Sequence, residues 1–186
     1  MKISRNILGA VVAFTTVFTM AQPARAQFTP GYTDVGPVLG LGGIGSASIA
    51  IGGRFEHGIK TLPDLADGVL SFELSVNYYH WNYGLLGVNY GVTYVPFGAT
   101  ANYHFTLKST PKFDPFVGLG LGYEAVSCSY QGGIGTCGYN SALYFIGRLG
   151  ARYFFAPKMA LYADVGAGAA TLNIGVTFAL KSQGSH

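Results

Sequence analysis

The feature of this sequence that most limits its possible folds is an alternation between two kinds of residue. Leu119 and Leu121 alternate with glycines. In the same way, Leu149 is flanked by Arg148 and Gly150. Successive side chains of a β-strand point to opposite faces, so each such segment predicts a strand with one bulky apolar face and one small or polar face. The alternation occurs in segments 69–80, 115–127, 142–155, 159–167 and 171–180.

Runs of this kind, counted between turn-forming separators, predict eight strands. Val, Ile, Phe, Tyr and Thr recur throughout, as is typical of strands, and helix signals are nearly absent after the first residues. The separators 60–68, 108–114 and 156–158 contain the Pro, Asp and Gly residues that turns favour. The predicted strands are 35–44, 47–58, 69–80, 90–106, 115–127, 142–155, 159–167 and 171–180.

Residues 1–26 have the three parts of a cleavable signal peptide. Lys2 and Arg5 precede an apolar run from 7 to 20, and Ala24-Arg25-Ala26 supplies the small residues at a cleavage site. The alternative is a membrane-spanning helix, but the run is shorter than the ~20 residues that a span requires. The sequence therefore predicts residues 1–26 as the signal and 27–186 as one domain.

Cleavage would change the charge of the protein. Three of the 11 Lys and Arg residues precede position 27, so the mature chain has eight basic and eight acidic side chains, a formal net charge of zero. A nucleic-acid partner would call for a basic patch or stripe. The sequence predicts no nucleic-acid partner.

The two cysteines, Cys128 and Cys137, predict a disulfide, because exported proteins fold in an oxidising compartment. The alternative is a pair of free thiols. No histidine lies at ligand spacing from either cysteine, so the sequence predicts no metal site there.

The composition of the two faces indicates which one points inward. An eight-stranded barrel has an interior only just wide enough for side chains to fill. Several large apolar residues from each strand would overfill it, whereas glycine, serine and a few charges fit. A soluble barrel would also need a charged surface rather than one made largely of glycine. The prediction is therefore an all-β, up-and-down antiparallel transmembrane β-barrel of about eight strands, apolar outside and polar inside.

The charged residues sort in the same way. Every mature lysine lies in a turn or at a strand end, and all three mature arginines lie on the polar face. We expect these arginines and the nearby acids to form a network in the barrel interior (the lumen), where they either pair to satisfy one another or gate a narrow channel. The predicted network is Arg54, Glu56, Glu73, Glu124, Arg148, Arg152 and Asp164.

Aromatic residues gather toward the predicted strand ends. Two aromatic girdles at the membrane interfaces would give this distribution, as would the ordinary preference of aromatics for strands. One group is Tyr78, Trp81, Tyr83 and Tyr90; the other is Tyr103, Phe105, Phe113, Tyr153 and Phe155.

Over residues 35–180, the chain resembles the small eight-stranded outer-membrane barrels of the OmpA and OmpX type. The segment from Pro115 to Tyr123 is similar to a recurring strand in these proteins, and that from Leu172 to Phe178 looks like the last-strand signal of barrel assembly. That signal usually ends a protein at an aromatic residue, whereas here residues 179–186 follow. The resemblance implies an outer-membrane location after export, with membrane lipids and the barrel-assembly machinery as partners.

The sequence favours a structural or interaction barrel with a polar, largely filled lumen and no catalytic, cofactor or metal residues. A porin-like narrow channel for ions or small solutes is the alternative. A lipid-modifying enzyme would use His104 with a nearby Ser71, Thr100 or Asn102, but the His-x-Ser pairing of the barrel enzymes that it would resemble is absent. The sequence predicts no oligomeric state.

Overall fold

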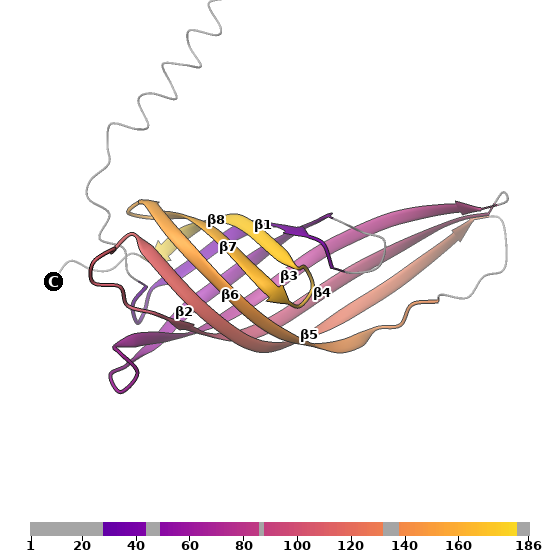
Figure 1. Cartoon of the computed structure of the whole chain (residues 1–186). Helices are drawn as coiled ribbons and strands as arrows, with labels where there is room; N and C mark the ends of the chain where they lie inside the picture. Colours follow the sequence, from indigo (N-terminus) through magenta and orange to yellow (C-terminus); the bar gives the residue numbers. More distant parts are fainter. Residues whose placement is uncertain (1–27, 44–48, 86–87, 132–137, 182–186) are drawn as a thin grey trace, which may run out of the picture.

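The computed structural model describes residues 28–43, 49–85, 88–131 and 138–181, which form one closed antiparallel barrel (Figure 1). Each strand pairs with its neighbour in sequence and β1 pairs with β8, so the predicted all-β, up-and-down, eight-stranded fold is confirmed. Among the described residues, no helix is long and apolar enough to cross a membrane. The strands are β1 (Thr33–Leu41), β2 (Ile49–Leu62), β3 (Gly68–Leu85), β4 (Val88–His104), β5 (Phe113–Gln131), β6 (Ala142–Ala156), β7 (Met159–Ala167) and β8 (Leu172–Lys181).

The strand boundaries differ from the prediction by one to five residues at most strand ends, and two of these differences change the loops. β1 ends at Leu41 rather than at residue 44, because Gly42 and Gly43 adopt positive φ angles of 69° and 122° that end the extended backbone. Residues 81–85 continue β3 instead of forming a loop. Asn82 and Gly84, which predict a turn by composition, pair with residues of β4 there.

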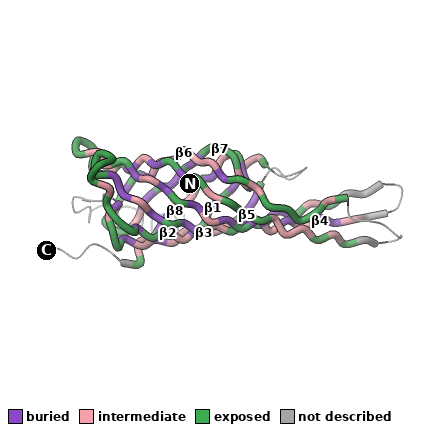
Figure 2. The backbone as a smooth tube through the Cα atoms, turned by 90° about the horizontal axis from the view of Figure 1, so that it is seen from below, coloured by how far each residue is buried: buried purple, intermediate pink, exposed green. Residues whose placement is uncertain are grey.

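The side chains have the predicted orientation. Leu119, Leu143 and Leu149 are 64%, 76% and 60% exposed on the outside of the barrel, whereas Arg54 and Arg152 are buried inside it. Figure 2 shows buried and exposed positions alternating along the strands. The outward apolar side chains, Leu119, Leu143 and Leu149 among them, form a surface here called the apolar belt, and the interior contains buried arginine side chains.

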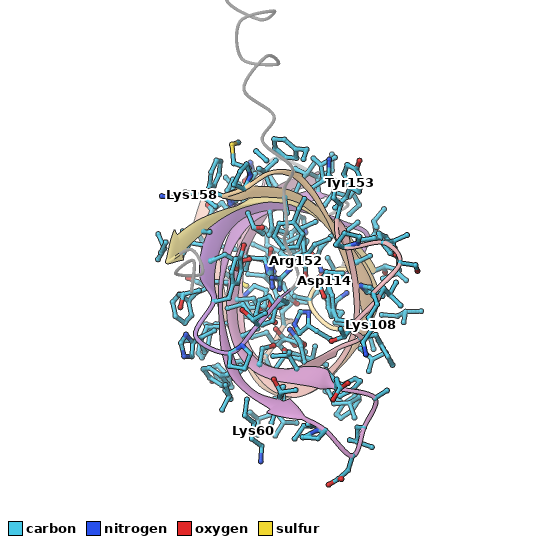
Figure 3. All side chains as sticks on the ribbon, turned by 90° about the vertical axis from the view of Figure 1, so that its left-hand side faces the viewer. Lys60, Lys108, Asp114, Arg152, Tyr153 and Lys158 are labelled. Atoms are coloured by element: carbon cyan, nitrogen blue, oxygen red, sulfur yellow. The ribbon has the colours of Figure 1, made fainter. Side chains whose placement is uncertain are left out.

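The barrel has two distinct ends, and three lysines lie at one of them. One end, here called the turn end, contains the connections after β2, β4 and β6, together with the start of β1 and the end of β8, because Thr33 pairs with Lys181. Lys60, Lys108 and Lys158 lie at this end, around the outside of the ring of strands (Figure 3). The other end, here called the loop end, contains the connections after β1, β3, β5 and β7.

Three strands continue past the loop end of the barrel (Figure 1). The last registered pair between β2 and β3 is Ile51 with Tyr78, and the last between β5 and β6 is Glu124 with Ala142. Beyond these pairs, and within the described residues, the registered pairs of β3, β4 and β5 are with one another. This extension, residues 79–85, 88–95 and 125–131, projects by roughly 20 Å at the usual rise per strand residue.

One face of the extension is covered by aromatic side chains. Tyr79, Val92 and Tyr94 are buried, and the Trp81 ring stacks on Tyr94 with centroids 5.1 Å apart. Tyr139 contacts both rings edge-on. Trp81 and Tyr90 therefore pack into this cluster, not on the apolar belt as a girdle would require. At the turn end, Phe105, Phe113, Tyr153 and Phe155 are exposed on the outside as the girdle prediction expects.

The predicted disulfide falls partly outside the described residues. Cys128 lies in the part of β5 that belongs to the extension and is half-buried. Cys137 lies outside the described residues, so the disulfide stays a prediction.

Candidate functional site: the polar interior

The barrel interior brings together charged and polar side chains from six strands. These side chains are buried because alternate positions of β1 to β6 point inward. Figure 3 shows Arg152 and Asp114 inside the ring of strands. The set, here called the ion cluster, is Asp34, Arg54, Glu56, Ser71, Glu73, Asn102, His104, Asp114 and Arg152.

Glu56 occupies the centre of the ion cluster. Its carboxylate accepts hydrogen bonds from Arg54, Arg152 and Ser71. The same carboxylate accepts from Asn102 Nδ2 at 2.9 Å and lies 2.8 Å from His104 Nε2. A buried carboxylate is stable only when its oxygens are paired, and here other strands of the barrel supply most of the partners.

The two arginines each bridge more than one acid. Arg54 Nη2 donates to Glu73 Oε2 at 2.7 Å, and its Nη1 lies 3.9 Å from an oxygen of Asp34. Arg152 Nη1 donates to Asp34 Oδ2 at 2.9 Å, which joins β6 to β1 across the lumen. Asn102 also donates to Glu73 Oε2 at 2.9 Å, so the acids are linked by neutral as well as charged donors.

His104 lies between two carboxylates. Its Nδ1 is 3.0 Å from both oxygens of Asp114, and its Nε2 faces Glu56. Ionised carboxylates only accept hydrogen bonds, so both contacts are satisfied only when both ring nitrogens carry hydrogen and the ring is cationic. The ion cluster then contains fewer cations than carboxylates. The three cations are Arg54, Arg152 and His104, and the four carboxylates are Asp34, Glu56, Glu73 and Asp114.

Ser71, His104 and Asp114 have the spacing of a nucleophile, a base and an orienting acid. Ser71 Oγ lies 3.1 Å from His104 Nε2, and Asp114 faces Nδ1. A base must present a lone pair to the nucleophile, but Nε2 faces Glu56 as a donor, and the Ser71 hydroxyl donates to Glu56 as well. Ser71 and His104 are 0% and 1% exposed, and neither lines the cavity between Arg54 and Arg148 or the apolar groove beside Phe97.

A second ionic group lies nearer the loop end. Arg148 Nη1 is 3.1 Å from Asp164 Oδ1, which also accepts from Asn173 Nδ2 at 2.9 Å. Tyr162 connects the two groups, because its hydroxyl donates to Asp164 while its ring lies 4.0 Å from the Arg54 guanidinium.

The connection between β7 and β8 folds over this second group. Ala169 and Ala170 are buried, and the carbonyl of Ala170 accepts from Arg148 Nη1 at 2.7 Å. The Tyr79 hydroxyl donates to the carbonyl of Ala169. The cavity between the two ionic groups measures about 30 Å³, room for a water molecule or two.

The structure places six of the seven predicted network residues in these two groups. Arg54, Glu56, Glu73 and Arg152 belong to the ion cluster, and Arg148 pairs with Asp164. Glu124 stands apart: it is half-buried at the base of the extension and makes no ion pair with a described residue.

Sequence reasoning missed two acids of the ion cluster. Asp34 precedes the predicted start of the first strand by one residue, and Asp114 was counted within the separator 108–114. Both are at inward positions once the strands are extended to Thr33 and Phe113. The signal that could have found them is the alternation itself, continued outward by two positions from Gly36 and from Phe116.

The isolation of Glu124 leads to a prediction. We expect Glu124→Gln to change the unfolding midpoint by no more than about 2 °C, because the substitution breaks no ion pair and surface-like changes cost little. The midpoint can be measured in detergent as the temperature at which the folded band is lost on a gel. A shift as large as that of an ion-cluster variant would place Glu124 in the network after all.

Comparisons with known proteins leave the family of this chain unassigned. No protein-family model matches the sequence, and no curated protein matches it.

Among the described residues, no group of three or more His, Cys, Asp or Glu side chains could hold a metal ion.

Solved structures are similar in architecture. One is Ail, the attachment invasion locus protein of Yersinia pestis, in complex with the heparin analogue sucrose octasulfate, at 10% identity and a TM-score of 0.48, covering 80% of this chain and 93% of Ail. A second crystal structure of Ail has 9% identity, a TM-score of 0.46 and coverage of 81% and 96%. At this identity, the likeness concerns the arrangement of the strands and not a ligand.

Proposed function

We propose that this protein is an outer-membrane barrel that anchors an interaction surface and has no catalytic activity. The observation that carries the proposal is the apolar belt. Large apolar side chains of every strand face outward while charged residues face inward, an arrangement that water would disfavour and hydrocarbon requires. The nine- and ten-residue strands β1, β7 and β8 match the length that tilted strands need to cross a bilayer.

We propose that the lumen does not conduct ions. The ion cluster fills the half toward the turn end, and the β7–β8 connection covers the Arg148–Asp164 pair at the loop end. We expect purified protein in planar bilayers to show no stable conductance steps. Stable steps that change with Arg148→Ala would instead support the narrow-channel alternative.

The proposed absence of catalysis rests on the interior geometry. Ser71, His104 and Asp114 are buried, and Glu56 accepts hydrogen bonds from both the Ser71 hydroxyl and His104 Nε2, so no lone pair of His104 is left to activate the serine. We expect the lipid A acylation pattern of cells that express the protein to match that of cells with an empty vector. An altered pattern that disappears with Ser71→Ala would contradict the proposal.

The extension is the proposed interaction surface. It projects beyond the apolar belt, and no Lys, Arg, Asp or Glu occurs in residues 79–95 or 125–141. These segments are rich in Tyr, Ser, Gly and Asn, the residues that antibody loops use for contacts with low entropic cost. A polyanion such as the heparin analogue bound by Ail would find no basic side chain there. The proposed partner surface is therefore uncharged, and its binding should depend little on salt.

The charge difference between the two ends gives a test of orientation. We propose that the turn end faces the periplasm, because outer-membrane barrels reach farther from the bilayer on the external side, and the extension of β3, β4 and β5 lies at the loop end. An amine reagent too large to pass porins should then leave Lys60, Lys108, Lys112 and Lys158 unlabelled on intact cells. Asn82→Lys, which places an amine at an exposed position of the extension, should become labelled.

Labelling of the natural lysines on intact cells, with the amine of the Asn82→Lys variant unlabelled, would reverse the orientation. If the natural lysines and the amine of the Asn82→Lys variant are labelled only after the cells are disrupted, neither end of the barrel is exposed at the cell surface.

A further inference from the structure

A short segment before β1 folds into the barrel mouth at the turn end. Phe28 and Tyr32 are only 3% and 5% exposed. They pack with Val69, Phe154 and Ala160, which belong to β3, β6 and β7. Residues 28–32 are here called the N-terminal plug.

The plug contacts two of the three cations of the ion cluster. The Phe28 ring stacks on the His104 ring, with centroids 4.0 Å apart and planes at 12°. The Arg152 guanidinium lies 4.6 Å from the centroid of the same ring. An aromatic face next to desolvated cations is attractive, so Phe28 both covers the cluster and stabilises its charge.

Backbone hydrogen bonds attach the plug to β2. Gly31 N donates to the carbonyl of Gly58 at 2.8 Å, and Gly58 N donates to the carbonyl of Tyr32 at 2.9 Å. A Cβ on Gly58 would lie 2.4 Å from the carbonyl oxygen of Thr29, so only glycine permits this approach.

The plug lies beside the seam where the first and last strands meet. In this seam, the register shifts between Thr33 and Asp34, and neither Gly36 nor Pro37 has a registered partner on β8 within the described residues. Proline also lacks the N–H that a ladder needs. Ala179 of β8 packs against the plug cluster, and the Thr33 hydroxyl of β1 donates to the carbonyl of Gly31 at 3.5 Å, so the plug contacts both strands of the seam.

The seat of the plug exists only in the closed barrel, because its residues come from β2, β3, β4, β6, β7 and β8. We propose that the N-terminal plug is a clasp: it docks after the barrel closes, holds the β1–β8 seam together and shields His104 from the turn end. If cleavage occurs after Ala26 as the sequence predicts, one residue, Gln27, would precede the plug, and the mature chain would begin next to the clasp.

The test is the accessibility of His104 in the folded protein. Hydroxyl radicals oxidise exposed histidines whether or not the ring is protonated, and peptide mass spectrometry reads each site separately. In the natural protein, we expect His57 and His80 to react and His104 to be protected, since His57 and His80 are exposed and His104 is buried. In Phe28→Ala, His104 should react several-fold faster while His57 and His80 are unchanged, and the unfolding midpoint should fall by about 5–10 °C.

Phe113→Ala is the matched control, because Phe113 is 42% exposed on the outside of the barrel near the same end. It should leave His104 protected. If Phe28→Ala does not fold, Phe28→Leu retains apolar volume but loses the ring, and His104 should again become reactive. Protection of His104 in a folded Phe28 variant equal to that in the natural protein would overturn the proposal.

Discussion

Replacement of Arg152 by methionine is expected to be the most damaging single change in the barrel interior. Arg152 is fully buried and pairs with Asp34 and Glu56, so its loss leaves two carboxylates in a low-dielectric interior with fewer cations. With His104 cationic, the ion cluster would change from three cations and four carboxylates to two and four. Breaking a buried pair in this way costs roughly 3–5 kcal/mol. For a chain of this size, we expect a loss of about 10–15 °C in the unfolding midpoint measured in detergent.

Two further variants separate the charge effect from lost packing. Lys158→Met removes an exposed cation at the same end and should leave the midpoint nearly unchanged. The double variant Arg152→Met with Glu56→Gln restores an excess of one carboxylate over the cations, and should therefore be more stable than Arg152→Met alone. Additive or greater destabilisation in the double variant would show that packing, and not charge balance, makes Arg152 important.

The fold was predictable from the sequence because one physical rule determined it repeatedly. Each strand alternates between large apolar and small or polar residues, and an eight-stranded barrel can accept only the small set inside. Leu119 and Arg152 are on the faces that this argument assigned to them, 64% and 0% exposed. The inward or outward direction of each side chain follows from the alternation alone, so the register of strand pairing was not needed to predict it.

The extension was not predictable by the same reasoning. Residues 81–85 and 129–131 lie in strands, whereas loops rich in glycine and tyrosine were expected near 81–89 and 129–140. Composition favoured turns there, whereas the observed pairing of Asn82 with Gly91 and of Gly91 with Ser129 depends on a neighbour strand that no local pattern reveals. Tertiary context overrides local propensity at such positions.

The interior was predictable in composition but not in connectivity. Alternation identified Arg54, Glu56, Glu73 and Arg152 as inward residues, but it contains no information on depth along the barrel. Glu124 has the same parity as the buried acids and still lies beyond the ion cluster, since β5 continues past the barrel. Height along the axis depends on the stagger of the strands, which only the register specifies.

A charge placed on the apolar belt gives the most direct test of the membrane assignment. Leu119 lies in the middle of an outward row with Val117 and Leu121. In a bilayer, arginine at such a depth costs roughly 2–4 kcal/mol, so Leu119→Arg should fold poorly into lipid vesicles and be depleted from the outer-membrane fraction. The folded share can be read from the difference in gel mobility before and after boiling.

Ser127→Arg supplies the control on the same strand and the same face. Ser127 is exposed in the extension, eight residues beyond Leu119, where the strand has left the barrel. Arginine is solvated there, so Ser127→Arg should fold as well as the natural protein. A soluble barrel would tolerate both substitutions equally, because water would solvate either guanidinium. Equal tolerance would therefore contradict a hydrocarbon environment around the belt, whereas selective damage at Leu119 distinguishes depth in the bilayer from a general intolerance of charge on β5.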